Sequence, residues 1–267
     1  MIQAIAHPTD FSPEGQAAFV HALRLALAFR CRLDLLHVRD PRDHNHFDRF
    51  PHVREVLQRW GVLAPGAAVE DITARTGVTV RKIEIRDGDA VDGLARFLKD
   101  HRPDLTVMAT HGRDGLSRWL HGSVSSEITQ ETHVPTLLLG PEARPFADPV
   151  GGGMTLARVL VPVARDPAPE PALRRLLPIT GGLGVTLKLV HVGPDAPQVR
   201  DASGALLPVR EIEGPVVEGI LAEARASDVD LIAMPTAGPH GLFDALRGST
   251  TERVAAQAPC PVLALPA

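Results

Sequence analysis

The sequence predicts a duplicated α/β fold, in which two doubly wound domains each carry a five-stranded parallel sheet. Near-continuous apolar runs alternate with amphipathic helical patterns, which is typical of parallel strands covered by helices on both faces. The same plan then restarts after residue 156, and matched segments stand at regular distances along the chain. Alternation and repetition together indicate two copies of one domain.

The first half contains five predicted strands separated by predicted helices. The strands are short and apolar, and they cover residues 2–7, 32–38, 78–85, 104–110 and 134–140. The helices are expected from residue 13, near 53–61 and 68–75, over 90–101 and over 124–133. Ser12, Pro13 and Glu14 start the first of them, because the hydroxyl caps a free N–H, proline presets the backbone and the acid faces the positive helix end.

The second half repeats this order after a segment rich in proline and glycine, "PEARPFADPVGGGM". We therefore expect a first domain over 1–141, a linker over 142–156 and a second domain over 157–267. Val192 follows its counterpart Val38 by 154 positions, whereas Gly214 follows Gly88 by 126. The second copy thus lacks the helical stretch of residues 41–76.

Composition excludes several classes of partner. Of the 267 residues, 44% are hydrophobic. The chain contains 28 Lys and Arg and 32 Asp and Glu, which gives a net charge of −4. Neither nucleic acid nor a membrane surface is therefore expected as a partner. Cys31 and Cys260 have neither metal nor disulfide spacing, which favours a reducing cytoplasm. We expect no signal peptide and no membrane span.

Two stretches, "MATHGRDGLSRWLHGS" at 108–123 and "MPTAGPHGLFDALRGS" at 234–249, align without a gap. In the first, Gly112 follows a strand end, and nine residues separate it from Gly122 and Ser123 at the start of a helix. Backbone N–H groups at a glycine turn and at a helix N-terminus bind anions. Because ligands of doubly wound sheets bind beyond the carboxyl ends of the strands, this spacing predicts a phosphate site there.

These residues, with "HPTDFS" at 7–12 and "LLHV" at 35–38, resemble the universal stress protein family, whose ATP-binding members carry G-x-x-G, nine residues, then G-S or G-T. The resemblance covers both halves, although Ala109 replaces the first glycine. It implies an ATP site, with or without Mg²⁺, in which Asp10 binds the adenine or ribose end and the backbone of Val38 contacts adenine. ADP and AMP remain alternatives. The implied site residues are Pro8, Thr9, Asp10, Val38, Ala109, Gly112, Arg113, Gly122, Ser123, Val124 and Ser125.

The second copy departs from this pattern. Ala164 stands in place of Asp10, Pro235 in place of Ala109 and Ala237 in place of His111. Proline has no N–H to donate, so this half is expected to bind no nucleotide. Its fifth strand and that of the first half, both apolar, would lie at sheet edges, where unpaired backbone groups favour pairing with each other in a pseudo-twofold dimer. A further homodimer of whole chains is left open.

Several residues have a second interpretation. Asp10 can serve as a turn or capping residue instead of a ligand. His44, His46 and His52 show no metal-ligand spacing, and no metal site is expected. There is no Walker A run and no G-x-S-x-G, so no catalytic residue is expected, and only His111 is a candidate base. We expect an ATP-binding stress-response regulator with an unknown protein partner; the alternatives are a scaffold without nucleotide and a slow ATP hydrolase.

Overall fold

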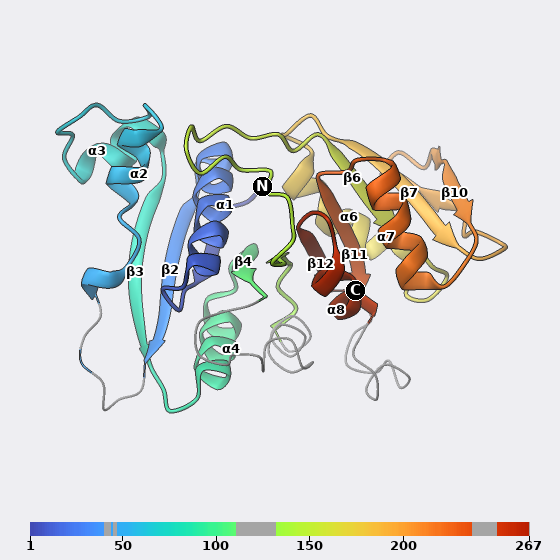
Figure 1. Ribbon diagram of the computed structural model, residues 1–267, viewed down its shortest axis with the longest axis horizontal. Coiled ribbons are helices and arrows are strands. Elements are labelled where there is room, and N and C mark those ends of the chain that lie inside the picture. The colour runs from blue at the N-terminus through green and yellow to red at the C-terminus, as the bar shows by residue number, and fades with distance from the viewer. Residues whose placement is uncertain (40–43, 45–46, 111–131, 237–249, 267) are drawn as a thin grey trace.

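The computed structural model describes residues 1–39, 44, 47–110, 132–236 and 250–266. The first half alternates strands and helices in the expected order as far as residue 110, and its fifth expected strand is present (Figure 1). The helix expected over 124–133 lies outside the described residues except for its last two positions. Its elements are β1 (Ala4–Pro8), α1 (Pro13–Phe29), β2 (Arg32–Arg39), a 3-10 helix (Phe47–Arg49), α2 (Val53–Arg59), α3 (Glu70–Thr76), β3 (Thr79–Arg86), α4 (Ala90–His101), β4 (Leu105–Ala109) and β5 (Thr136–Leu139). The predicted strands are confirmed to within a few residues at each end.

The second half repeats the plan with one difference. Its elements are β6 (Arg158–Pro162), α6 (Pro169–Thr180), β7 (Thr186–Val192), β8 (Val199–Arg200), β9 (Leu206–Leu207), β10 (Val209–Ile212), α7 (Val216–Ala226), β11 (Leu231–Thr236), α8 (Thr250–Gln257) and β12 (Val262–Pro266). Residues 193–208, all described, contain the antiparallel hairpin β8–β9 and no helix. The second copy therefore lacks counterparts of α2 and α3, as its length predicts.

Both halves contribute to one sheet. Within the described residues the strand order is β10-β7-β6-β11-β12-β5-β4-β1-β2-β3. The neighbouring strands within each half pair in parallel, and β5 and β12 join the halves by antiparallel pairing, with Leu137 opposite Leu263 and Leu138 opposite Val262. The predicted pairing of the two fifth strands is confirmed. The β5 edge of the first half and the β12 edge of the second thus close each other, and β3 and β10 are the outer strands of the sheet.

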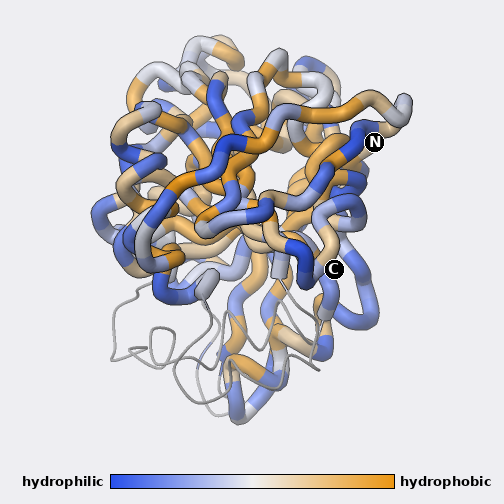
Figure 2. Tube along the Cα trace, turned by 90° about the vertical axis from the view of Figure 1, so that its right-hand side faces the viewer, coloured by the Kyte–Doolittle hydropathy of each residue, from blue (hydrophilic) through white to orange (hydrophobic). Residues whose placement is uncertain are grey.

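Helices cover the sheet on two faces. Along β2, Leu35 packs in the cluster formed with α1, α2 and α6, whereas Leu36 packs in the cluster formed with α4, α7 and α8. Along β5, Leu137 packs in the first of these clusters and Leu138 in the second. Successive strand residues point to opposite faces, so apolar residues at every position are buried on both. Figure 2 shows hydrophobic stretches through the centre of the body.

The first helix begins as its sequence predicts. Ser12 is the N-cap of α1, its side-chain oxygen accepts the N–H of Gly15 at 3.0 Å, and Pro13 occupies the first turn. Arg30 ends the helix in the left-handed conformation, with φ of 52°. The Ser12 bond satisfies one of the N–H groups that the start of a helix leaves unpaired, and the Arg30 N–H donates to the carbonyl of Ala26 at the other end.

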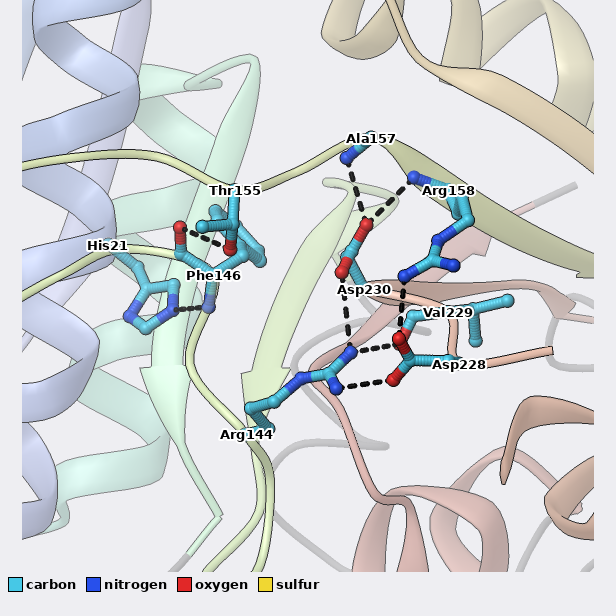
Figure 3. A network of polar contacts seen from close by, with 9 residues as sticks. All are labelled: His21, Arg144, Phe146, Thr155, Ala157, Arg158, Asp228, Val229 and Asp230. Carbon is cyan, nitrogen blue, oxygen red and sulfur yellow. Dashed lines mark hydrogen bonds and ion pairs between the residues drawn. The ribbon is translucent and has the colours of Figure 1, made fainter. Parts of the chain in front are cut away.

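The segment 142–156 is packed against both halves (Figure 3). The Arg144 guanidinium forms ion pairs with Asp228 and Asp230 of the second half. Phe146 is buried, and its N–H donates to Nε2 of His21 on α1 at 3.2 Å. Side-chain contacts thus fasten this segment on two sides. The division of the chain at residues 141 and 157 stays a prediction.

Candidate functional site

The carboxyl ends of β1 and β4 lie side by side where the strand order of the first half reverses. From β1 the chain moves to β2 and β3 on one side, and it returns to β4 on the other side of β1. Pro8 ends β1 and Ala109 ends β4. Such a switch point is where doubly wound sheets bind ligands. The fold therefore brings Pro8, Thr9, Asp10 and Ala109 to one edge.

Thr9 connects the end of β1 to β2. Its N–H donates to the carbonyl of Leu36, and Nδ1 of His37 donates to the carbonyl of Thr9, both at 2.8 Å. The carbonyl can only accept, so the proton of the His37 ring lies on Nδ1 when the ring is neutral. Val38 follows in β2 on the α4 face, where a Cβ added to Gly93 would lie 3.2 Å from its Cγ1. The predicted residues Thr9, directly after β1, and Val38, in the neighbouring strand β2, thus lie close to the same edge of the sheet.

Asp10 organises the turn between β1 and α1. Its Oδ1 accepts the Ser12 N–H at 3.0 Å and the Ser12 hydroxyl at 2.6 Å. The same hydroxyl oxygen caps α1 through Gly15, and a Cβ on Gly15 would lie 3.0 Å from the Asp10 carboxylate. These bonds confirm the interpretation of Asp10 as a turn residue, whereas the cap of α1 is Ser12. The role of Asp10 as a ligand-binding residue stays a prediction. The position of its carboxylate near the N-terminus of α1 is compatible with that role.

An aromatic group lies beside this turn, and the sequence analysis missed it. Phe11 has a φ of 62°, and its ring lies 4.2 Å from that of His37 and 5.6 Å from that of Phe50, centroid to centroid. The Arg49 guanidinium lies 4.6 Å from the Phe11 ring. A positive φ is unusual for a bulky residue and marks a constrained turn. Because these contacts join distant parts of the chain, no local pattern could have revealed them.

His7 lies directly below the edge, in the core. Its Nδ1 donates to the carbonyl of Val107 on β4 at 2.9 Å, and the side chain is fully buried. Burial lowers the pKa of His7 to about 4, against which the bond to Val107 and the charge of Asp10 act only in part. Among the described residues its Nε2 has no hydrogen-bond partner. The ring is therefore neutral at pH 7 and ties β1 to β4.

The second half folds the equivalent edge in the same way. The Val163 N–H donates to the carbonyl of Val190, and Nδ1 of His191 donates to the carbonyl of Val163, both at 2.8 Å. These bonds reproduce those of Thr9 and its partners in β2. Ala164 follows Val163 and has no carboxylate. The two copies therefore share the backbone of this edge and differ in its chemistry.

Residues 1–140 and 198–266 match the model of the universal stress protein family. These segments make up more than half of the chain. The chain belongs to the universal stress protein family. The membership confirms the resemblance that the motifs carry, and the two matched segments fall in the two halves of the chain.

Individual relatives of this universal stress protein agree with that placement. A curated universal stress protein of Methanocaldococcus jannaschii is 28% identical over 145 residues, which are 52% of this chain and 82% of that protein. The crystal structure of a universal stress protein from Archaeoglobus fulgidus covers 98% of this chain and 96% of its own, with a TM-score of 0.62 and 19% identity. A functionally unknown protein from Pseudomonas aeruginosa PAO1 covers 99% and 92%, with a TM-score of 0.63 and 16% identity. The two structures share the fold with this chain.

The predicted phosphate-binding residues lie outside the described part of this universal stress protein. They are Gly112, Arg113, Gly122, Ser123, Val124 and Ser125. Thr110, the last described residue before them, donates its N–H to the carbonyl of Leu139 in β5 at 2.9 Å. The chain thus leaves the sheet at the carboxyl edge, next to the end of β1. The role of the six residues stays a prediction.

Metal-ligating side chains do not converge in the part of the chain that the structure describes. These residues contain no cluster of three or more His, Cys, Asp or Glu side chains that could hold a metal ion. His52 is described and lies 3.8 Å from Glu55, whereas His46 lies outside the described ranges. Within those same ranges no helix is both long and apolar enough to cross a membrane.

Proposed function

We propose that this universal stress protein binds an adenine nucleotide, ATP with or without Mg²⁺, in the half formed by residues 1–141. The observation that carries the proposal is the convergence of Thr9, Asp10 and Ala109 at the switch point of the sheet, directly before the glycine-rich stretch 112–123. In this arrangement the backbone N–H groups of Gly112 and Gly122 and the hydroxyls of Ser123 and Ser125 hold the phosphates. Asp10 and the backbone of Val38 hold the ribose and adenine.

The half formed by residues 157–267 binds no nucleotide in this proposal. It keeps the backbone hydrogen bonds of the edge, including that of His191, but Ala164 and Pro235 remove a carboxylate and an N–H donor. Its role is then structural, because β12 closes the edge of the sheet at β5. Nucleotide occupancy in the first half acts as a non-enzymatic stress signal that a protein partner reads. Buried, unpaired Cys31 and Cys260 fit action in a reducing cytoplasm.

Thermal unfolding with and without nucleotide tests the proposal. A ligand that binds only the folded state at a hundredfold excess over Kd stabilises it by about 2.7 kcal/mol. We expect ATP to raise the Tm of the wild type and of Gly248→Asp, the matched change in the second copy. Gly122→Asp should abolish the shift, because the carboxylate occupies and repels the phosphate position. Absence of any shift with ATP, ADP or AMP in the wild type would favour a scaffold without nucleotide.

A second pair of variants separates the two roles of Asp10. Asp10→Asn keeps an oxygen that accepts from Ser12, so the turn should persist while a charged ligand contact is lost. Asp201 of the second half is a matched control, since its Oδ1 accepts the N–H of Ser203 at 2.8 Å and the Ser203 hydroxyl at 2.6 Å, as Asp10 does with Ser12. We expect Asp10→Asn, and not Asp201→Asn, to weaken ATP binding in calorimetry. Equal affinities in the two variants would leave Asp10 with the turn role alone.

ATP turnover is the test of the enzymatic alternative. We expect the rate of ATP hydrolysis by repurified protein to equal that of buffer alone. Hydrolysis that persists through purification and disappears in His111→Ala would instead identify the protein as a slow hydrolase.

A further inference from the structure

A cavity of about 620 Å³ lies at the sheet edge opposite the nucleotide site proposed above. Its walls include Ile2 before β1, Asp104 before β4 and Pro135 before β5. Parallel strands present their amino ends at the same edge, which is why these positions meet. Helix α4 of the first half and helix α6 of the second complete the lining. The cavity therefore lies between the two copies of the fold.

The lining is strongly cationic, although the whole chain has a net charge of −4. Lys99 and Arg102 come from the end of α4, and Arg174 and Arg175 come from α6. Asp104 is the one acid in the described lining, and its Oδ2 already accepts two backbone N–H groups at the start of β1, at 2.7 and 3.0 Å. In the described lining, three arginines and Lys99 thus share the cavity with one engaged carboxylate.

Helix dipoles account for only half of these charges. Lys99 lies in the last turn of α4 and Arg102 is its C-cap residue, where cations are stabilised by the negative helix end. Arg174 and Arg175 lie near the middle of α6, whose last turn contains no basic residue. Among the described residues, neither Arg102 nor Arg174 has an ion-pair partner. Gathering cations without internal partners is unfavourable unless an anion neutralises them.

One of the arginines is already held in place across the two halves. Nη1 of Arg175 donates to the carbonyl of His133 at 2.8 Å, in the segment that leads into β5. This bond uses one of the five N–H donors of the guanidinium. The planar fork matches phosphate oxygens, and fixing it beforehand reduces the entropy lost when a ligand binds.

We propose that this cavity binds a small soluble anion with several phosphate groups. Its volume falls within the range of about 300 to 1,000 Å³ typical of small-molecule sites. Three arginines match a multiply charged phosphate better than a single carboxylate. Because Arg102 and Arg174 belong to different halves, the anion bridges the two copies. The site is independent of the nucleotide site at the carboxyl edge.

Calorimetric titration with inorganic tripolyphosphate, at constant ionic strength, tests the proposal on the full chain. The pocket variant is Arg102→Glu with Arg174→Glu; both side chains are exposed, so the fold should persist, which circular dichroism checks. Arg54→Glu with Arg59→Glu makes the same change of charge on α2, outside the cavity. We expect the wild type and the α2 variant to bind with equal Kd, and the pocket variant to bind at least about tenfold more weakly.

Two further titrations distinguish tripolyphosphate bound in this cavity from tripolyphosphate bound at the carboxyl edge and from nucleic acid. Gly122→Asp should retain the tripolyphosphate binding that the pocket variant loses, whatever the fate of ATP binding at the carboxyl edge. Unchanged affinity in the pocket variant, or no binding by the wild type, would overturn the proposal. Binding of a duplex oligonucleotide without binding of tripolyphosphate would overturn it as well, since the partner would then be nucleic acid.

Discussion

His21→Gln is expected to remove much of the acid sensitivity of this protein. His21 lies on α1 and is fully buried. Its Nδ1 donates to the carbonyl of Ala17 at 2.8 Å, while its Nε2 accepts the N–H groups of Phe146 and Ala147 at 3.2 and 3.4 Å. Figure 3 shows the bond to Phe146. A second ring proton would leave Nε2 without a lone pair for these bonds, so the folded protein requires the neutral ring.

The size of the stability loss on acidification follows from the pKa of His21. Burial lowers the pKa of His21 from 6.5 to about 4, and the bond to Ala17 opposes this only in part. Between these values the unfolded chain binds a proton that the folded chain excludes, so stability is full above pH 6.5 and falls as the pH decreases towards 4. From pH 7.5 to 4.5 the loss is about 2.5 kcal/mol for this one histidine. His7, whose pKa is lowered in the same direction to about 4, adds a similar loss.

Urea unfolding at a series of pH values measures this effect. In His21→Gln the amide oxygen can still accept from Phe146, so we expect a modest cost at neutral pH. The free energy of unfolding of the wild type, relative to that of the variant, should then fall by about 2.5 kcal/mol as the pH falls from 7.5 to 4.5. The wild type should fall in the same direction relative to His7→Asn, which keeps a donor for Val107. Parallel pH profiles for wild type and His21→Gln would refute the reasoning.

Three other changes test the packing. Ser12→Ala removes the cap of α1 and should lower the free energy of unfolding in urea by about 1 kcal/mol, whereas Ser12→Thr, which keeps the hydroxyl that bonds both Gly15 and Asp10, should retain most of it. Gly140→Ala places a Cβ 2.7 Å from the carbonyl oxygen of Ala255 in α8, and calorimetry should show a lower Tm; Gly88→Ala, with open space around it, is the control. Asp230→Ala leaves two backbone N–H groups at the start of β6 unpaired and should cost about 1 to 3 kcal/mol.

Each of these has an outcome that would contradict it. Equal urea midpoints for Ser12→Ala and wild type would mean that the cap contributes nothing. A Tm for Gly140→Ala equal to that of Gly88→Ala would show that α8 moves at no cost. Asp228 is the control for Asp230, because it pairs with the same Arg144 but its side chain is 57% exposed. A larger loss in Asp228→Ala than in Asp230→Ala would assign the stability to the ion pairs instead.

Much of the candidate site could be predicted from local sequence. Ser12, Pro13 and Glu14 fix where α1 begins, and therefore where Asp10 stands relative to β1. The order of strands and helices then puts Asp10 and Ala109 at one edge of the sheet. The contacts of Phe11 with Phe50 could not be predicted, since they depend on how residues 47–60 fold back over that edge.

By itself the sequence determined the duplication, the alternation of strands and helices, and the apolar strands that need cover on both faces. Repeated segments, helical periodicity and continuous apolar runs can all be recognised along the chain. Only the tertiary structure decided that segment 142–156 is held by His21 on one side and Asp230 on the other. It also decided that Arg102 and Arg174 share a cavity. Such contacts join residues far apart in the chain, and their partners are selected by the geometry of the packed helices rather than by any local pattern.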